Sequence, residues 1–557
     1  MTAALQNAVT RIADRDAWNF FVFRKVRETL ELRELVKELR REIELLATSS
    51  GSPLDSLVRA GEIESGLADL GFPSAAVAAK LTDALAHVAD GSTVNRRALL
   101  DLLNSLPDRA TLRCSHPEGF SYYGLNPLDF ADLARRIQCE LRPNVAVIGI
   151  RTVGTTLGAV VMAALRSQHR RVDRISVRPE GEPYHRSTRL DATQTAWVRE
   201  QLQGDADFLV VDEGPGFSGS TFISVARALE RIGVPRDRIT LLCSRPFHPQ
   251  AGNISQSGEW MRYRSHVLDY GRRLPPEAGL HLANGKWRHI LYSSRETWPA
   301  SWTELERIKH LSRDESSLFK FEGFGRFGAG VKQRAAILSA GGYAPMLRGF
   351  TDGYAEYHFV KGRPFTANSA NQQLLSCMAQ YCAFRAAQFP ASQPDTLPLV
   401  SMMRTNIELE FSRSSPISEL PVERPVYPDC QMQPHEWLFT SSGRFVKTDG
   451  ADHAEGHQLP GPVDIAWDIA GSIIEWDLPC SVAEDFVREY QRRSGDPLLK
   501  RLSPYLLAYC VLKLAYFRMA AASTSSCTEA DTLHRQYQIY ASKAEALLQE
   551  PRFPASK

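Results

Sequence analysis

The sequence lacks the features by which several classes of protein are recognised. Its nine cysteines are scattered and odd in number, and no two form a Cys-x-x-Cys pair, so we expect reduced thiols and no zinc site. No basic-then-apolar signal sequence opens the chain, and we expect no apolar run to reach membrane-spanning length. These absences predict a soluble, cytoplasmic protein without a membrane partner.

Charge of either sign is not in excess. Lysine and arginine together number 66, against 64 aspartates and glutamates, which leaves a net charge of +2. This balance argues against nucleic acid as a partner, since no basic module stands out. What the chain has in quantity is apolar residues, at 43% of 557 residues. Sizeable cores are therefore expected, and the length suggests about three or four domains.

The most informative stretch runs from Phe208 to Thr221, with the sequence FLVVDEGPGFSGST. Phe208 to Val211 is a short apolar run that predicts a buried strand of a parallel sheet. Asp212 and Glu213 then fall at the carboxyl end of that strand, the edge at which open α/β sheets bind ligands. A turn rich in glycine and hydroxyl groups leads into a helix predicted over 221–231, and the free N–H groups of its first turn favour an anion.

Paired acids beside an anion site are explained by one ligand, a sugar diol whose own phosphate lies in the loop. The stretch resembles the phosphoribosyl pyrophosphate (PRPP) loop of type I phosphoribosyltransferases, with one more residue between the acids and the Gly-x-Thr end. The resemblance implies that Asp212 and Glu213 bind the ribose hydroxyls. It also implies a 5′-phosphate site formed by Gly216, Ser218, Gly219, Ser220 and Thr221. The alternative is an ordinary strand, turn and helix with a glycine-rich connection.

A second strand, loop and helix precede this stretch. Asn144 to Ile150 predicts another buried strand, and a helix of small residues is predicted over 157–165. In the family that the chain resembles, the first such unit binds pyrophosphate through backbone amides. The resemblance therefore implies a pyrophosphate site at Arg151, Thr152, Val153 and Gly154.

Two further segments of this region suit a transferase. Arg178 to Arg189 is basic and rich in turn formers, and the resemblance implies a mobile loop that closes over pyrophosphate, with Arg178 and Arg186 as catalytic cations. A basic linker is the alternative. His116 to Tyr123 combines aromatic and polar residues suited to a nucleobase-like acceptor, although a packed loop is the simpler explanation.

The chemistry that these residues would perform can be stated directly. Breaking the bond between the ribose anomeric carbon and pyrophosphate develops positive charge on the sugar and negative charge on the leaving group. Mg²⁺, backbone amides and a closing basic loop would stabilise the leaving group, while Asp212 and Glu213 position the ribose. The resemblance thus implies phosphoribosyl transfer from PRPP to a small-molecule acceptor.

A second module is predicted from about residue 285. Ser317 to Phe321 predicts a strand that contains Lys320, followed by a helix over 331–340 and a strand over 354–360. This order resembles the small lobe of an aminoglycoside phosphotransferase-like kinase. The glycine cluster over 321–330 follows the lysine strand, whereas a kinase glycine loop precedes it, so a phosphate site there has little support.

The large-lobe resemblance rests on a motif and a spacing. Asp429 to Glu436 stands in the place of the kinase catalytic loop, and Asp449 ends a strand-like run thirteen residues after Glu436. Gln431 occupies the position of the catalytic aspartate and cannot accept a hydroxyl proton. The resemblance implies that Lys320 and Asp449 contact ATP, and that Asp449 and Glu436 hold Mg²⁺.

Several assignments in this module stay open. Asp429 is a candidate for the missing base. Val463 to Ala470 resembles the helix start that braces a kinase catalytic loop, and Leu499 to Ala521 predicts a buried helix pair in the large lobe. Acids and histidines cluster at Asp452, His453, Glu455 and His457, and a solvated loop is a simpler explanation for them than a metal site.

These patterns together predict a multidomain protein of α/β and α+β class. We expect a helical region over 1–95, a doubly wound, parallel-sheet phosphoribosyltransferase-like domain over 96–275, and a bilobal kinase-like domain over 285–550. The amphipathic stretch from Val26 to Leu46 is expected to form a homodimer contact or to cap the next domain. The expected ligands are PRPP, an unknown acceptor, ATP and Mg²⁺. The alternatives are a non-catalytic sensor of PRPP or nucleotide, and a metabolite kinase with a rearranged catalytic loop.

Overall fold

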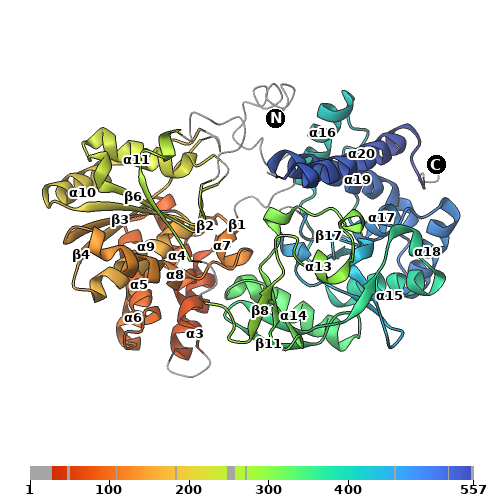
Figure 1. The fold of residues 1–557 in the computed structure, drawn as a ribbon, viewed down its shortest axis with the longest axis horizontal. Coiled ribbons are helices and arrows are strands. Elements are labelled where there is room, and N and C mark those ends of the chain that lie inside the picture. The colour runs from red at the N-terminus through yellow and green to blue at the C-terminus, as the bar shows by residue number, and fades with distance from the viewer. Residues whose placement is uncertain are drawn as a thin grey trace. The chain divides into compact units, whose positions relative to one another are not determined.

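The computed structural model describes residues 28–46, 51–107, 109–181, 185–216, 218–247, 258–269, 273–456, 459–524 and 526–553. These residues form two compact units. The N-terminal unit takes in the described residues of Val26–Pro276 together with Gly323–Gly328, and the C-terminal unit takes in Glu277–Glu322 and those of Ala329–Lys557. The two units are drawn in Figure 1 and are described separately below.

The N-terminal unit is built on a parallel five-stranded sheet with the order β4-β3-β5-β6-β7. Its strands are β3 (Asn144–Ile150), β4 (Arg171–Val177), β5 (Asp207–Val211), β6 (Ile239–Cys243) and β7 (Arg264–Val267). Its longer helices are α3 (Leu32–Leu45), α4 (Pro53–Asp69), α5 (Ala75–Ala89), α6 (Arg96–Asn104), α8 (Pro127–Ile137), α9 (Val153–Ser167), α10 (Ala192–Gln203) and α11 (Ser220–Ile232). The apolar runs predicted as strands at β3 and β5 are confirmed, because both are buried along their length.

Both faces of this sheet are covered, as strands without polar alternation require. Ile148 and Val210 share a core with Val198 of α10 and Phe222 of α11. On the other face α9 packs on β3 and β4, and α4, α5 and α8 pack on α9. Figure 1 shows α10 and α11 on one side of the sheet and α8 and α9 on the other. The unit is therefore doubly wound.

The region before residue 95 is not helical throughout. β1 (Glu28–Glu31) pairs antiparallel with β2 (Thr111–Cys114), so part of the stretch expected to be helical is a strand instead. α3 begins only at Leu32, and four of its apolar residues, Leu32, Leu35, Leu39 and Ile43, are buried while α4 and α6 pack against it. The stripe that was expected to offer a homodimer contact is thus covered within the unit, which removes the basis of that expectation.

A buried ion network fixes the preceding helices to the sheet. Arg174 of β4 donates from both terminal nitrogens to Glu64 of α4, each at 2.8 Å, and its Nε donates to Asp83 of α5. The side chains of Arg174 and Glu64 are 3% and 4% exposed. A bidentate pair of this kind loses most of its value if one partner is removed, because the other charge is left buried.

The C-terminal unit contains a five-stranded antiparallel sheet with the order β11-β12-β10-β9-β8. These strands are β8 (Ala278–His281), β9 (Lys309–Ser312), β10 (Ser317–Phe321), β11 (Leu347–Thr351) and β12 (Tyr354–His358). Smaller sheets combine β13 (Gly362–Pro364), β15 (Trp437–Thr440) and β16 (Phe445–Lys447), and separately β14 (Pro425–Val426) and β17 (Val463–Asp464). Its longer helices are α14 (Arg326–Ala340), α15 (Gln372–Gln388), α16 (Leu397–Phe411), α17 (Ala466–Glu475), α18 (Cys480–Ser494), α19 (Leu499–Ser523) and α20 (Cys527–Gln549).

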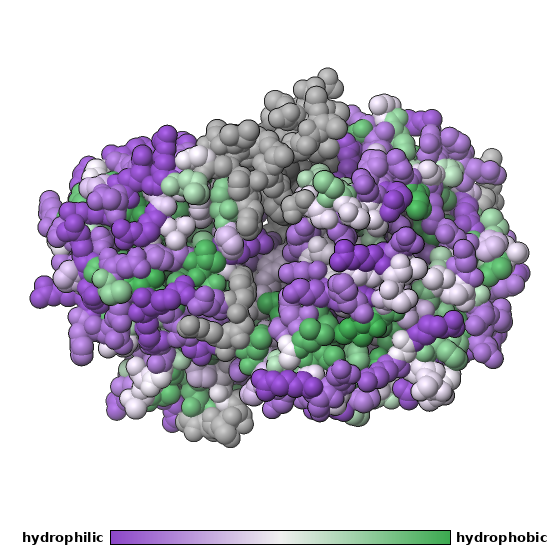
Figure 2. Space-filling model, in the orientation of Figure 1, coloured by the Kyte–Doolittle hydropathy of each residue, from purple (hydrophilic) through white to green (hydrophobic). Residues whose placement is uncertain are grey.

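The apolar stretch near the end of the chain is one helix rather than the expected pair. α19 spans 25 residues and is the one helix in the described part of the chain that is long and apolar enough to cross a membrane. However, 67% of its apolar window is buried inside the unit, where α17, α16 and α20 pack against it. A core helix of a folded domain has this character. Hydrophilic residues cover most of the face seen in Figure 2.

The glycine cluster after β10 is part of the N-terminal unit. Phe324 N donates to Phe120 O at 3.0 Å, and Arg326 forms ion pairs with Glu62 and Glu28. Gly323 and Gly325 have φ angles of 120° and 51°, which glycine adopts without strain. These contacts account for the cluster as a packing element.

The buried ion network gives a first prediction. Arg174→Met leaves Glu64 and Asp83 without their cation, whereas Arg488→Met removes exposed ion pairs with Glu484 and Asp485. We expect the first variant to lose about 3–5 kcal/mol of unfolding free energy and the second less than about 1 kcal/mol. Calorimetric unfolding of the full chain measures both, and similar losses in the two variants would contradict the assignment.

Candidate functional sites

Two loops meet at the carboxyl edge of the parallel sheet. From β3 the chain crosses through α9 to β4, whereas β5 pairs with the opposite side of β3. The change of direction therefore falls between β3 and β5, and open α/β sheets bind ligands at such a point. The loop over 151–154 follows β3, and the loop over 212–219 follows β5. Both sequence-predicted ligand loops thus flank the same point.

Gly154 lets these two loops approach each other closely. A Cβ at this position would lie 2.3 Å from the carbonyl oxygen of Val211 and 3.4 Å from the Cα of Asp212. Only glycine admits such an approach without displacing the backbone. The peptide bond between Arg151 and Thr152 is cis. The predicted pyrophosphate loop and the paired acids therefore share one surface.

Asp212 and Glu213 are half-buried at the end of β5. Burial raises the pKa of Asp212 to about 7. Burial, together with the nearby carboxyls of Glu118 and Asp212, raises the pKa of Glu213 to about 8. One oxygen of Glu213 accepts a hydrogen bond from Gly119 N at 2.9 Å. Among the described residues neither carboxyl has a salt-bridge partner, so each loses hydration without gaining a paired cation.

Hydroxyl groups gather at the start of α11, as the sequence predicted. Ser218 Oγ donates to Ser220 Oγ at 2.9 Å, and Ser220 N donates to Ser218 Oγ at 3.2 Å. Gly219 caps the helix with a φ of 64°, and Thr221 lies in its first turn. Gly216 is exposed. Backbone N–H groups and hydroxyls at one helix start suit a phosphate.

Asp69, at the end of α4, joins two of the predicted arginines. Its Oδ1 lies 3.0 Å from Arg151 Nη1, and its Oδ2 lies 2.5 Å from Arg178 Nη2. Arg178 also donates to Arg151 O at 2.7 Å and to Thr152 Oγ1 at 3.3 Å. Burial alone would raise the pKa of Asp69, but the two guanidinium groups hold it below its usual value. Arg178 therefore braces the 151–154 loop instead of belonging to a segment free to close over it.

The rest of the basic segment forms its own turn. Glu180 and Ser187 exchange two backbone hydrogen bonds of 2.8 Å, and Arg186 donates to Gly181 O at 2.6 Å. The described residues leave out 182–184 of this segment and Phe217 of the loop over 212–219. The closing motion predicted for 178–189 stays a prediction.

The 116–123 segment lies against the paired acids. It contains the short helix α7 (Glu118–Ser121), which presents Gly119 N to Glu213. A Cβ on Gly119 would lie 2.8 Å from the Glu213 carboxyl carbon. His116 stacks on Tyr122 with ring centroids 5.1 Å apart. The segment is thus packed, as the simpler explanation expected, and it also forms one wall of the candidate site.

The second candidate centre lies in the C-terminal unit around Lys320. This lysine is buried, and its Nζ lies 2.7 Å from Asp452 Oδ1 and 3.2 Å from Asp449 Oδ1. Lys309, opposite it on β9, lies 3.1 Å from Asp449 Oδ2. Burial alone would lower the pKa of Lys320, but these carboxylates raise it. The lysine predicted to meet nucleotide phosphates is therefore paired with acids of its own unit.

The loop at 452–457 is not the solvated loop that the sequence suggested. Asp452 and His453 are only 3% and 9% exposed. Asp452 pairs with Lys320, and this pair offsets the cost of burying its charge. His453 is compensated in the same way, because its Nδ1 lies 3.1 Å from Asp429 Oδ1. Glu455 pairs with Arg334 of α14 at 2.8 Å. His457 lies outside the described residues.

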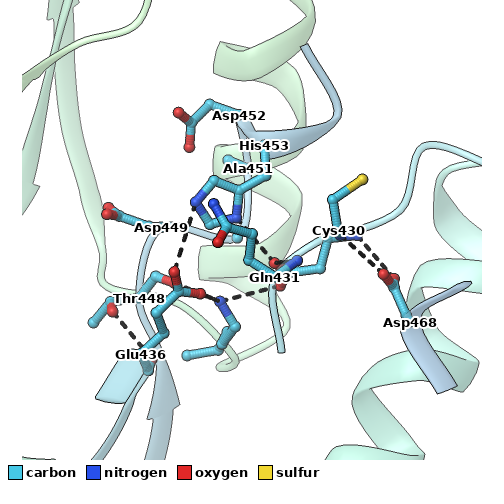
Figure 3. Close-up of polar contacts among 12 residues, drawn as sticks. Cys430, Gln431, Glu436, Thr448, Asp449, Ala451, Asp452, His453 and Asp468 are labelled. Carbon is cyan, nitrogen blue, oxygen red and sulfur yellow. Dashed lines mark hydrogen bonds and ion pairs between the residues drawn. The ribbon is translucent and has the colours of Figure 1, made fainter. Parts of the chain in front are cut away.

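Asp468 fixes the segment that resembles a catalytic loop. From the first turn of α17 its carboxylate accepts hydrogen bonds from Asp429 N at 2.8 Å and Cys430 N at 2.9 Å, as Figure 3 shows. The structure therefore has the brace implied by the resemblance. Gln431, the next residue, presents its amide oxygen 3.5 Å from Lys513 Nζ.

Asp429 is not placed to act as the missing base. Its side chain is wholly buried, one oxygen faces His453, and the other accepts a hydrogen bond from Tyr381 and lies 3.3 Å from Lys447 Nζ. Burial alone would raise the pKa of Asp429, but Lys447 and His453 hold it well below its usual value. A carboxylate with both oxygens engaged inside the protein has no route to a substrate proton.

The predicted metal ligands Asp449 and Glu436 fall into different groups. Within the described residues, the set close enough to share an ion is Asp429, Glu436 and His453, whose ligand atoms all lie within 4.8 Å of one another. Asp449 instead faces the two lysines of the sheet. Asp449 is therefore paired with lysines and is not a member of this group of three, and the Mg²⁺ assignment stays a prediction.

Sequence reasoning missed three residues that shape these centres. Asp69 carries no motif, and only its ion pairs across the fold reveal it. Lys309 and Lys447 each lie in a strand, and a lysine among buried apolar residues is a signal that could have singled them out.

No protein-family model and no curated protein matches this chain. Several solved structures are similar to part of this chain. The choline kinase LicA from Streptococcus pneumoniae is 12% identical, with a TM-score of 0.30 over 42% of this chain and 89% of that one. An ethanolamine kinase from Plasmodium vivax is 12% identical, with a TM-score of 0.29 over 42% and 80%. The GDP complex of aminoglycoside 2′-phosphotransferase-IIIa is 13% identical, with a TM-score of 0.30 over 43% and 89%. The proposals below rest on the geometry of the two centres.

The raised pKa of Asp212 gives a second prediction. Its folded value of about 7 exceeds its ordinary value of 3.8, so the carboxyl destabilises the unit increasingly as pH rises from about 4 to about 7. Asp212→Asn removes that cost. We expect its stability advantage over the parent chain to grow between pH 5 and pH 8, to on the order of 1–4 kcal/mol. Calorimetric unfolding at both pH values measures this.

The control for this experiment is Asp205→Asn, because Asp205 is exposed and its arginine partners lower its pKa. No growing advantage is expected for that variant. An Asp212→Asn variant whose advantage stays constant from pH 5 to pH 8 would show that Asp212 ionises normally in the folded chain.

Proposed function

We propose that the N-terminal unit transfers a phosphoribosyl group from PRPP to a small-molecule acceptor and releases pyrophosphate. The observation that carries the proposal is the meeting of two half-buried carboxyls with two helix-start loops at the point where the sheet order changes direction. A ligand with a diol and with phosphates on either side of it matches this arrangement, because the diol would face the carboxyls and each phosphate would face one helix-start loop. The resemblance of 208–221 to a PRPP loop supports the same ligand.

The paired acids would hold the ribose. Ionising Asp212 or Glu213 is costly in the ligand-free site, and hydroxyl donors from a sugar would favour the ionised forms. Sugar binding should therefore lower both pKa values and release protons near neutral pH. Neither acid needs to act as a base, since their role is to position the anomeric carbon.

The leaving pyrophosphate would lie against the 151–154 loop. Its backbone N–H groups open α9, a helix of 15 residues, and Arg151 and Arg178 hold positive charge beside it. Asp69 fixes both guanidinium groups, which keeps them in place before the ligand arrives. The carboxyl oxygens of Asp212 and Glu213 and the hydroxyl oxygens over 218–221 are of the kind that suits Mg²⁺. When bound with pyrophosphate, that ion would neutralise charge on the leaving group.

For the C-terminal unit we propose a nucleotide-binding scaffold instead of a phosphoryl-transfer enzyme. Gln431 cannot accept a proton, and Asp429 has both oxygens engaged. We expect the full chain to show no ATP turnover. Turnover that is present in the parent chain and lost in Asp449→Asn would contradict this and favour a metabolite kinase.

The transferase proposal gives a prediction for PRPP binding. We expect the full chain to bind PRPP with Mg²⁺, and Asp212→Asn combined with Glu213→Gln to weaken binding at least about tenfold, because the ribose hydroxyls lose their charged acceptors. Isothermal titration calorimetry measures this, with Asp205→Asn as the exposed-acid control.

Unchanged PRPP affinity in a folded double variant would exclude the ribose site. PRPP binding without pyrophosphate release from any acceptor in a screen would favour the sensor alternative. The two halves of the proposal, ligand and reaction, are thereby tested separately.

A further inference from the structure

The centre of the C-terminal unit has the outline of a metal site. Asp429, Glu436 and His453 each offer a ligand atom, and these atoms lie within 4.8 Å of one another. The three side chains come from the braced segment, the short 3₁₀ turn before β15 and the turn after Asp449, and Figure 3 shows Glu436 and His453 pointing toward each other. Carboxylates and an imidazole in one cluster are a ligand set for a divalent cation.

That position is already taken by a cation of the chain itself. Lys447 Nζ lies 2.6 Å from Glu436 Oε2 and 3.3 Å from Asp429 Oδ2, and it donates to Thr448 O at 2.8 Å. Glu436 and the Thr448 carbonyl oxygen accept hydrogen bonds from this ammonium group, and Asp429 adds an ion pair. The side chain of Lys447 is 0% exposed. It therefore cannot turn to solvent and leave the carboxylates open without a rearrangement of the core.

The other predicted metal ligand is neutralised in the same manner. Asp449 presents one oxygen to Lys309 at 3.1 Å and the other to Lys320 at 3.2 Å. Both predicted ligands, Glu436 and Asp449, thus have a lysine at hydrogen-bonding distance. A divalent ion prefers several open oxygen ligands and bound waters. The residues present do not fit Mg²⁺.

We propose that the Lys447 ammonium stands in place of a divalent ion in this centre, and that Asp429, Glu436, His453 and Asp449 bind no Mg²⁺. The cluster carries two carboxylates against one ammonium and one imidazole, so its charge is balanced internally when the imidazole is protonated. A nucleotide bound by this unit would then be held without a metal. The inference concerns the C-terminal unit alone and does not depend on phosphoribosyl transfer.

Manganese is a suitable probe, because electron paramagnetic resonance counts free Mn²⁺ directly. The background for every sample is the full chain carrying Asp212→Asn and Glu213→Gln, which removes the other paired acids. We expect this chain to bind no stoichiometric Mn²⁺. Lys447→Met leaves the three ligands open and should bind one Mn²⁺ at least tenfold more tightly, with a melting temperature that Mn²⁺ raises. Adding Glu436→Gln should abolish both effects.

Two results would overturn the proposal. One is a Mn²⁺ ion bound by the background chain and lost on Glu436→Gln, because a metal would then share the site with Lys447. The other is a folded Lys447→Met variant that gains no Mn²⁺, because the ammonium would then not be what excludes the metal. Mn²⁺ binding by the background chain, measured with and without Glu436→Gln, tests the proposal even if Lys447→Met fails to fold.

Discussion

The constraint on which both centres depend is the cost of holding a carboxylate away from water. Ionisation of such a group is favourable only if a cation or hydrogen-bond donors replace the lost hydration. In the N-terminal unit, structural acids meet this condition: Glu64 has Arg174, and Asp69 has Arg151 and Arg178. Asp212 and Glu213 have backbone N–H donors but no paired cation, and burial raises their pKa values. The same fold therefore separates acids that hold it together from acids that destabilise it.

In the C-terminal unit the condition is met at every acid of the centre. Asp449 and Asp452 face lysines of the five-stranded antiparallel sheet, and Glu436 and Asp429 face Lys447. Removing one member of such a network would leave its partner buried and charged, which costs several kcal/mol in general. The network stabilises the arrangement of the segment over 429–436 and engages its acids with internal cations. Asp468 holds this segment through two backbone N–H groups, and the Gln431 side chain within it cannot accept a proton.

Sequence alone could predict the strands and the paired acids, because continuous apolar runs such as 144–150 and 208–211 need no long-range information. It could not predict which polar residues are buried. His453 and Asp452 were expected in solvent, and Lys320, whose ammonium pairs with the buried Asp452, lies 132 residues away in the chain. Asp69 was missed for the same reason. The glycine cluster at 321–330 had little support as a phosphate site, and the packing of Phe324 and Arg326 against Phe120 and Glu62 accounts for it.

The contrast between the units bears on where activity lies. Groups with strongly shifted pKa values that no partner offsets are typical of functional sites, since selection for stability alone would remove them. Asp212 and Glu213 have this character, and they lie at the sheet edge where ligands of α/β folds bind. The acids around Lys447 differ in that each has an internal cation, although burial also raises the pKa of Glu436. Ligand binding in the N-terminal unit would relieve an existing cost, whereas metal binding in the C-terminal unit would have to displace a buried ammonium that is hydrogen-bonded to Glu436 and Thr448.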